Sequence, residues 1–290
     1  MTDAWIFLAE QPVYYLALAG LLGVLVGSFL NVLAHRLPVM LQRQWQAEAE
    51  EVLGLPITLH DRLDLCLPAS RCPGCGHQIR AWENIPLLSY LMLRGRCAGC
   101  DAAISIRYPL VELGCALLTL VVAWALGPSN QALAMALLTW CLLGLSLIDA
   151  EHQVLPDVLV LPMIWVGLLV NALGLFVPLS DAVFGAAAGY LSLWSVFWLF
   201  KAVTGKDGMG YGDFKLMALI GAWGGWQVLP LTLMLASIVG ALVGLVLLRV
   251  RDVSLGTAIP FGPYLALAGW IALLWGDEIY ASYLQLIGFR

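Results

Sequence analysis

Apolar runs long enough to cross a lipid bilayer recur along this chain of 290 residues, and they limit its fold more than any other feature. About 20 helical residues cross a hydrocarbon core of about 30 Å. The sequence is 61% hydrophobic and 11% charged, which is more apolar surface than one water-soluble core can bury. Runs of sufficient length lie at 13–34, 109–126, 131–148, 158–179, 182–200 and 259–276.

A further apolar stretch, residues 216–248, is about 50 Å long as one helix and too long for a single crossing. Gly224, Gly225 and Pro230 supply a break that leaves a short helix before it and a full one after it. We therefore expect an all-α polytopic membrane protein with about eight transmembrane helices. Residues 1–12 contain no Lys or Arg, unlike a signal peptide, so the first span is expected to stay.

The basic residues orient these spans, because cytoplasmic loops retain Lys and Arg. Eight of the 14 lie between Arg36 and Arg107. With that loop in the cytoplasm, an eight-span topology leaves only Arg290 outside. The predicted domains are a first transmembrane helix (1–35), a cytoplasmic metal-binding insert (36–108) and a seven-helix membrane domain (109–290). A net charge of -5 argues against a nucleic-acid partner.

Two C-x2-C pairs in the polar insert predict a metal site, formed by Cys72, Cys75, Cys97 and Cys100. Four thiolates can close a tetrahedral shell, and a glycine before each second cysteine lets backbone amides turn toward the sulfurs. Two disulfides are the alternative, but a loop in a reducing cytosol favours metal. Zinc is the expected ion and iron remains open. A shell made only of protein ligands predicts a structural role.

Ionisable residues at membrane depth are costly, so each is a functional candidate. Asp149 ends the third span and Asp213 opens the sixth, which places both carboxylates at the same cytoplasmic boundary. For Glu112, an interfacial ion pair with Arg107 is a sufficient structural explanation. Asp157 follows Pro156 and is expected to cap the next helix.

Asp149 and Asp213 have the chemistry of an aspartic protease pair. Two nearby carboxyls can hold a water, one acting as base while its protonated partner polarises the scissile carbonyl. Gly210 and Gly212, in the sequence Gly-Tyr-Gly-Asp, are expected to shape the site by letting a substrate strand approach the backbone closely.

Several motifs together resemble a known family, the bifunctional type IV prepilin peptidases and N-methyltransferases of pilus and type II secretion systems. They are the runs Gly-Ser-Phe-Leu-Asn-Val (27–32), the paired cysteines, Arg-Tyr-Pro-Leu-Val-Glu (107–112), Leu-Pro-Asp (155–157) after Asp149, Gly-Tyr-Gly-Asp-Phe-Lys (210–215) and Pro-Phe-Gly-Pro (260–263).

The resemblance implies that Asp149 and Asp213 are catalytic and that the substrates are type IV prepilins and pseudopilins with a short basic leader, cleaved after a glycine. It implies a multi-pass enzyme of the bacterial inner membrane, with the active site and the zinc insert on the cytoplasmic side. It also implies methylation of the new amino terminus with S-adenosylmethionine, whose binding residues the sequence does not locate. Glu151 and Asp157 are candidates to attract the basic leader.

Three alternatives remain open at this stage. An intramembrane protease of the presenilin or signal-peptide-peptidase kind also uses a G-x-G-D aspartate, although Ile148 stands where that kind has tyrosine and the cysteine insert is unexplained. A proton-coupled transporter would use Asp149 and Asp213 as carriers. A membrane-anchored metal-binding module would use the spans only as an anchor.

Overall fold

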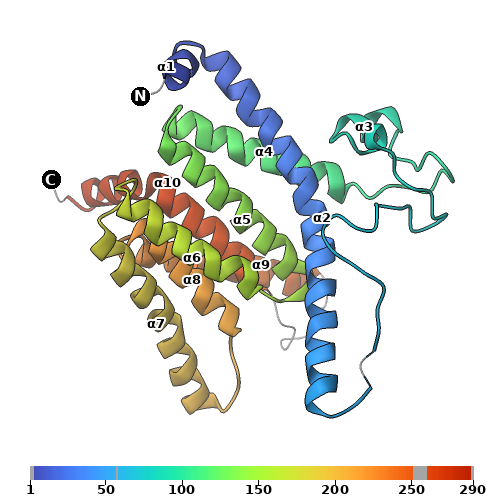
Figure 1. The fold of residues 1–290 in the computed structure, drawn as a ribbon. Coiled ribbons are helices and arrows are strands. Elements are labelled where there is room, and N and C mark those ends of the chain that lie inside the picture. The colour runs from blue at the N-terminus through green and yellow to red at the C-terminus, as the bar shows by residue number, and fades with distance from the viewer. Residues whose placement is uncertain (1–2, 57, 251–259, 289–290) are drawn as a thin grey trace. The chain divides into compact units, whose positions relative to one another are not determined.

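The structure is a computed structural model that describes residues 3–56, 58–250 and 260–288. Across these residues the chain is helical and contains no β-strand beyond two isolated bridges. It divides into two compact units, residues 1–129 and 130–290 (Figure 1). The expected all-α fold is confirmed.

The first unit is built on two long helices. Its elements are α1 (Asp3–Glu10), α2 (Pro12–Val52), the 3-10 turn η1 (Ala81–Asn84), α3 (Leu88–Met92) and α4 (Arg107–Leu126). Helices α2 and α4 pack closely because Gly23 and Gly27 have no side chain at their contact. A Cβ on Gly27 would lie 2.7 Å from the Cα of Glu112. The hydroxyl of Tyr15 donates to the carbonyl of Gly127 at 2.8 Å and joins the far ends of the pair.

Helix α2 is longer than the predicted first transmembrane helix, residues 1–35, and extends into the predicted insert. It is one helix of 41 residues that continues through Pro38. Pro38 removes one backbone donor, but no glycine or turn residue accompanies it, so the helix does not stop there. It ends before Gly54, whose φ of 65° favours glycine.

The second unit contains six helices: α5 (Asn130–His152), α6 (Asp157–Ala172), α7 (Leu179–Thr204), α8 (Tyr211–Gly224), α9 (Val228–Val250) and α10 (Gly262–Leu286). With α2 and α4 they correspond to the eight expected apolar segments. The break inside 216–248 falls where the glycines predicted it, because Gly225 ends α8 with a φ of 75°.

Helix α8 lies at the centre of this unit. It packs against α6, α7, α9 and α10, and 11 of its 14 residues are buried (Figure 1). The contact with α7 is the closest, since a Cβ on Gly189 or Gly221 would overlap backbone atoms of the facing helix. At about 21 Å, α8 is too short to cross a bilayer.

The fourth apolar segment ends earlier than expected, at Ala172 instead of Leu179. Buried Asn171 accounts for this. Its side-chain nitrogen donates to the carbonyls of Ala222 and Trp223, and its oxygen accepts from the amides of Phe176 and Val177. These bonds satisfy polar backbone groups of the turn between α6 and α7.

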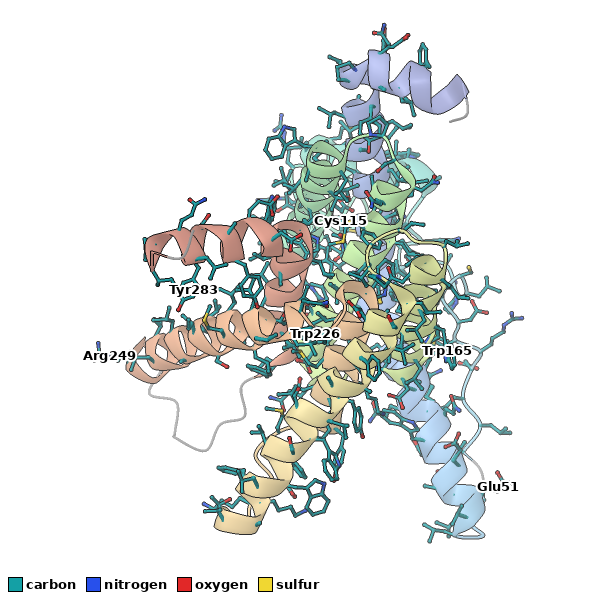
Figure 2. The ribbon with its side chains drawn as sticks, turned by 90° about the vertical axis from the view of Figure 1, so that its left-hand side faces the viewer. Glu51, Cys115, Trp165, Trp226, Arg249 and Tyr283 are labelled. Carbon is teal, nitrogen blue, oxygen red and sulfur yellow. The ribbon has the colours of Figure 1, made fainter. Side chains whose placement is uncertain are left out.

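Five helices among the described residues are long and apolar enough to span a membrane: α2, α4, α5, α7 and the 228–246 part of α9. Large apolar side chains stand outward along them and along the shorter helices. Trp165 on α6 is 67% exposed (Figure 2). Such surfaces suit lipid, so the chain is a multi-pass membrane protein.

Candidate active site and metal centre

Two aspartates are buried in the second unit at the ends of different helices. Asp149 lies in the last turn of α5 and Asp213 in the first turn of α8, with 6% and 7% exposure. The helices α6 and α10 pack against both α5 and α8. The two carboxylates interact electrostatically. A buried pair of interacting acids has the requirements for sharing one proton.

Gly262 completes the surroundings of Asp149. Its amide, at the start of α10, donates a buried hydrogen bond of 3.0 Å to Oδ2 of Asp149. A Cβ at this position would lie 2.6 Å from the same oxygen, so only glycine allows this approach. Gly262 lies in the Pro-Phe-Gly-Pro motif (260–263), to which the sequence assigns no role. A glycine beside Pro263 at a helix start was the available signal.

The two glycines of the Gly-Tyr-Gly-Asp sequence have different local roles. Gly210 precedes α8 with extended dihedrals that any residue can adopt. Gly212 lies against Leu155, whose Cβ would be 2.9 Å from an added Cβ. Leu155 also lies 3.4 Å from the Cβ position of Gly262, so it fills the space between the two glycines. Shaping of a substrate path by Gly210 and Gly212 stays a prediction.

Asp157 does not cap α6 as expected. Pro156 is the N-cap residue, and Asp157 is the first residue of the helix. Its carboxylate oxygens accept hydrogen bonds of 2.7 and 2.8 Å from Nζ of Lys215 on α8. A negative charge in a first turn is still favourable, but the side chain is engaged by another helix and not by its own backbone.

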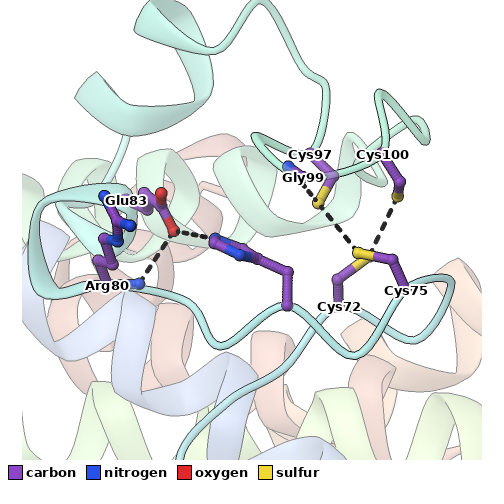
Figure 3. A network of polar contacts seen from close by, with 8 residues as sticks. Cys72, Cys75, Arg80, Glu83, Cys97, Gly99 and Cys100 are labelled. Atoms are coloured by element: carbon purple, nitrogen blue, oxygen red, sulfur yellow. Dashed lines mark hydrogen bonds and ion pairs between the residues drawn. The ribbon is translucent and has the colours of Figure 1, made fainter.

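The four cysteines of the first unit lie together. The sulfurs of Cys72, Cys75, Cys97 and Cys100 all lie within 4.8 Å of one another (Figure 3). The Cys72–Cys100 and Cys75–Cys97 sulfurs are 3.8 and 4.0 Å apart. A disulfide requires about 2.05 Å, whereas sulfurs about 2.3 Å from a tetrahedral ion stand about 3.8 Å apart. The cluster could therefore hold a metal ion.

Matching turns present these sulfurs. Each pair is flanked by an isolated bridge, Arg71 with Gln78 and Arg96 with Ala103. Hydrogen bonds from the backbone amides of Cys75 and Gly74 lower the pKa of the Cys72 thiol from its ordinary value to about 6. A thiolate is thus favoured at the cluster near neutral pH, which suits a cationic ligand.

A histidine and a glutamate support the first cysteine turn. Nε2 of His77 lies 3.0 Å from Oε2 of Glu83, which also accepts the amide of Arg80 at 2.9 Å (Figure 3). The hydrogen bond from the Arg80 amide is the main cause that lowers the pKa of Glu83, and His77 lowers it further. The pair fixes the chain that leaves Cys75.

The fold and these two centres define a multi-pass helical membrane protein that carries a buried aspartate pair and a separate four-cysteine cluster. Residues 21–126 match the bacterial peptidase A24 N-terminal domain, and residues 136–245 match the type IV leader peptidase family. The chain belongs to the type IV leader peptidase family.

Curated relatives match nearly end to end. A prepilin leader peptidase/N-methyltransferase of Pseudomonas putida is 70% identical over 98% of this chain and 99% of its own length. Proteins of the same name from Pseudomonas aeruginosa strain PAO1 and Aeromonas salmonicida are 64% and 56% identical over 98% and 95% of this chain, and over 98% and 96% of their own lengths. No solved structure matches the chain.

Proposed function

We propose that this protein is an aspartic endopeptidase that removes the basic leader from type IV prepilins and type II secretion pseudopilins. It cleaves after a glycine at the cytoplasmic face of the inner membrane and then methylates the new amino terminus with S-adenosylmethionine. The observation that carries the proposal is the buried pair Asp149 and Asp213 in a chain whose relatives are named for both activities.

In the proposed cleavage, Asp149 and Asp213 hold a water between them. One carboxylate takes a proton from this water as the water oxygen attacks the scissile carbonyl carbon, and the protonated partner donates a hydrogen bond to the carbonyl oxygen. The proton taken from the water passes to the leaving amine as the peptide bond breaks. The hydrogen bond from the backbone amide of Gly262 fixes the direction of the Asp149 carboxylate, so the reacting groups need no rearrangement. A substrate whose apolar segment lies in the bilayer would present its leader junction at the boundary where these helices end.

The four-cysteine cluster is proposed to bind zinc. A shell of four thiolates leaves no open position, so the ion would stabilise the fold of the insert and take no part in cleavage. In this proposal residues 1–35 are the first transmembrane helix, 36–108 the cytoplasmic zinc domain and 109–290 the protease domain. The concentration of Lys and Arg in 36–107 supports the cytoplasmic orientation.

S-adenosylmethionine would supply the methyl group as a reactive sulfonium. A Rossmann-type donor site does not fit the described residues, since they contain no strand to lead into a glycine-rich turn. The donor is therefore proposed to bind in another manner.

The test compares wild type with Asp149→Ala and Asp213→Ala, purified in detergent and incubated with a prepilin, with and without S-adenosylmethionine. Product masses should show loss of the leader by wild type only, and a methyl increment only when the donor is present. Asp277→Ala, an exposed aspartate on α10, is the matched control and should cleave normally. Cleavage by either active-site variant would refute the pair. A folded wild type that cleaves nothing would favour the transporter alternative.

A further inference from the structure

Two sequence motifs without an assigned role, residues 27–32 and 107–112, meet in the first unit. Asn31 on α2 donates from Nδ2 to the carbonyl of Tyr108 at 3.2 Å, and to the carbonyl of Gly27 at 3.3 Å. One helical turn away, the side chain of Ser28 lies close enough to interact with the carboxyl group of Glu112 on α4. We refer to Ser28, Asn31, Tyr108 and Glu112 as the Ser28–Glu112 cluster.

Glu112 is an intramembrane acid with unused bonding capacity. It is 8% exposed, and its Oε2 accepts the amide of Leu87 at 2.8 Å. Leu87 has a φ of 60°, an unfavourable value for a residue with a side chain, so the backbone is strained where it meets this carboxylate. A carboxylate accepts about four hydrogen bonds, and the Leu87 amide and the Ser28 side chain can supply two.

Asn31 carries the second unused acceptor. The residue is 5% exposed, and its Oδ1 has no hydrogen-bond partner among the described residues. The other atom of the Asn31 side-chain amide faces the carbonyls of Gly27 and Tyr108. Because carbonyls need a donor, that atom is the nitrogen. Nearly all buried polar atoms in proteins are paired, so an unpaired one marks a place where a partner is missing.

The unmet requirement of this cluster is for donors. A phosphate, carboxylate or carbonyl ligand would bring further acceptors, whereas a primary ammonium brings three N–H donors and a charge opposite to that of Glu112. A structural clamp between α2 and α4 explains the cluster less well. The close contacts of Gly23 and Gly27 and the Tyr15 bond already join these helices, and a clamp needs no orphan acceptor.

We propose that the Ser28–Glu112 cluster binds a primary ammonium group, the α-amino group of a polypeptide that begins with an apolar segment. Ser28 is the partly buried member of the cluster, whereas Asn31 and Glu112 are buried. Given the proposed function, this is the new amino terminus that is to be methylated. The cluster would then hold the methyl acceptor with residues of the first unit.

The first experiment measures binding alone. Calorimetry in detergent free of phosphatidylethanolamine compares a synthetic peptide with the mature amino-terminal sequence of a prepilin against its N-acetylated form. Wild type should bind the free amine about tenfold more tightly, as expected for a charge-assisted contact. In Glu112→Gln, the glutamine oxygen can still accept the hydrogen bond from the Leu87 amide. The ratio of affinities for the free and the N-acetylated peptide should fall below about twofold. Glu48→Gln, at an exposed glutamate of α2, is the matched control and should keep it.

The second experiment removes cleavage from the assay. Pilin that has already lost its leader is offered with S-adenosylmethionine to wild type, Glu112→Gln and Glu48→Gln. We expect methylation to fall at least about tenfold in Glu112→Gln and to persist in Glu48→Gln. A wild type that methylates nothing would refute the methyl-transfer half of the proposed function, and the peptide titration would still decide the ammonium site.

Two results would overturn the inference. One is a Glu112→Gln protein with unchanged metal content that keeps the preference for the free amine. The other is loss of co-purified phosphatidylethanolamine in Glu112→Gln without loss of that preference, which would show that the bound ammonium belongs to a lipid headgroup.

Discussion

The amide of Gly262 donates a hydrogen bond of 3.0 Å to Oδ2 of Asp149, a residue 113 positions earlier in the sequence. The start of α10 is thereby tied to the end of α5. Asp149 is held by backbone, which cannot change rotamer as a side-chain donor can. Gly262 is therefore a positioning residue for the proposed reaction, and its lack of a side chain is what permits the contact.

Gly262→Ala should abolish most cleavage. The added methyl group would lie 2.6 Å from Oδ2 and 3.1 Å from Cγ of Asp149, so the carboxylate must turn away. We expect kcat to fall about 100-fold, the scale of loss for a misplaced reacting group. Gly276→Ala on the same helix is the control, because its nearest neighbour would be 4.0 Å away. A normal rate for Gly262→Ala would contradict the positioning role.

Asp157→Asn should leave recognition of a basic leader unchanged within about twofold. Lys215 already neutralises Asp157 through two hydrogen bonds, so little negative charge is left to attract a substrate. The pair is partly exposed and worth at most about 1 kcal/mol to stability. Lys215→Met should lower KM for the basic leader by freeing that charge. A large rise in KM for Asp157→Asn would restore the hypothesis that Asp157 binds the leader.

Acid should release the metal from the cysteine cluster. Metal binding needs thiolates, and the pKa of Cys72 is lowered from 9.0 to about 6. Protons compete with the metal for all four sulfurs, so affinity should fall as pH is lowered, and the Cys72 thiolate is lost as pH falls through about 6. A chromogenic chelator would follow release. Cys100→Ser should lose the metal, whereas Cys66→Ser, an exposed cysteine outside the cluster, should retain it. Release that is independent of pH would argue against thiolate ligands.

Gly221→Ala should destabilise the second unit. An added methyl group would overlap the carbonyl of Gly185 and lie 3.0 Å from the amide of Ala186, so α7 and α8 must move apart. Overpacking of this kind costs about 1–3 kcal/mol. Thermal unfolding should show a lower Tm and reduced cleavage, because α8 carries Asp213. Gly114→Ala, which has no neighbour within 4 Å, should keep its Tm. An unchanged Tm for Gly221→Ala would mean that this contact is not tight.

The sequence predicts those features that depend on short stretches of chain. Apolar run length located the helices, and Gly225 marked the end of α8. The C-x2-C spacing identified residues whose sulfurs lie together. Each of these signals is local, so neighbouring residues are sufficient to read it.

Contacts between residues on different helices could not be predicted from the sequence. The role of Gly262 depends on a partner on another helix, and the pairing of Asp157 with Lys215 depends on how α6 and α8 pack. The early end of α6 depends on Asn171, whose hydrogen bonds reach the end of α8. In the sequence, Asn171 is one polar residue in an apolar run. Its polarity alone does not show that its side-chain amide ends the helix.

Because α8 is enclosed by four other helices, little of its surface is left for lipid. The depth of Asp213 is then set by protein contacts and not by bilayer thickness. A bacterium that alters its lipids with growth temperature would change the hydrophobic thickness around α7 and α9 and leave the setting of this aspartate intact. The short buried helix would thus separate the proposed chemistry at Asp213 from the physical state of the membrane.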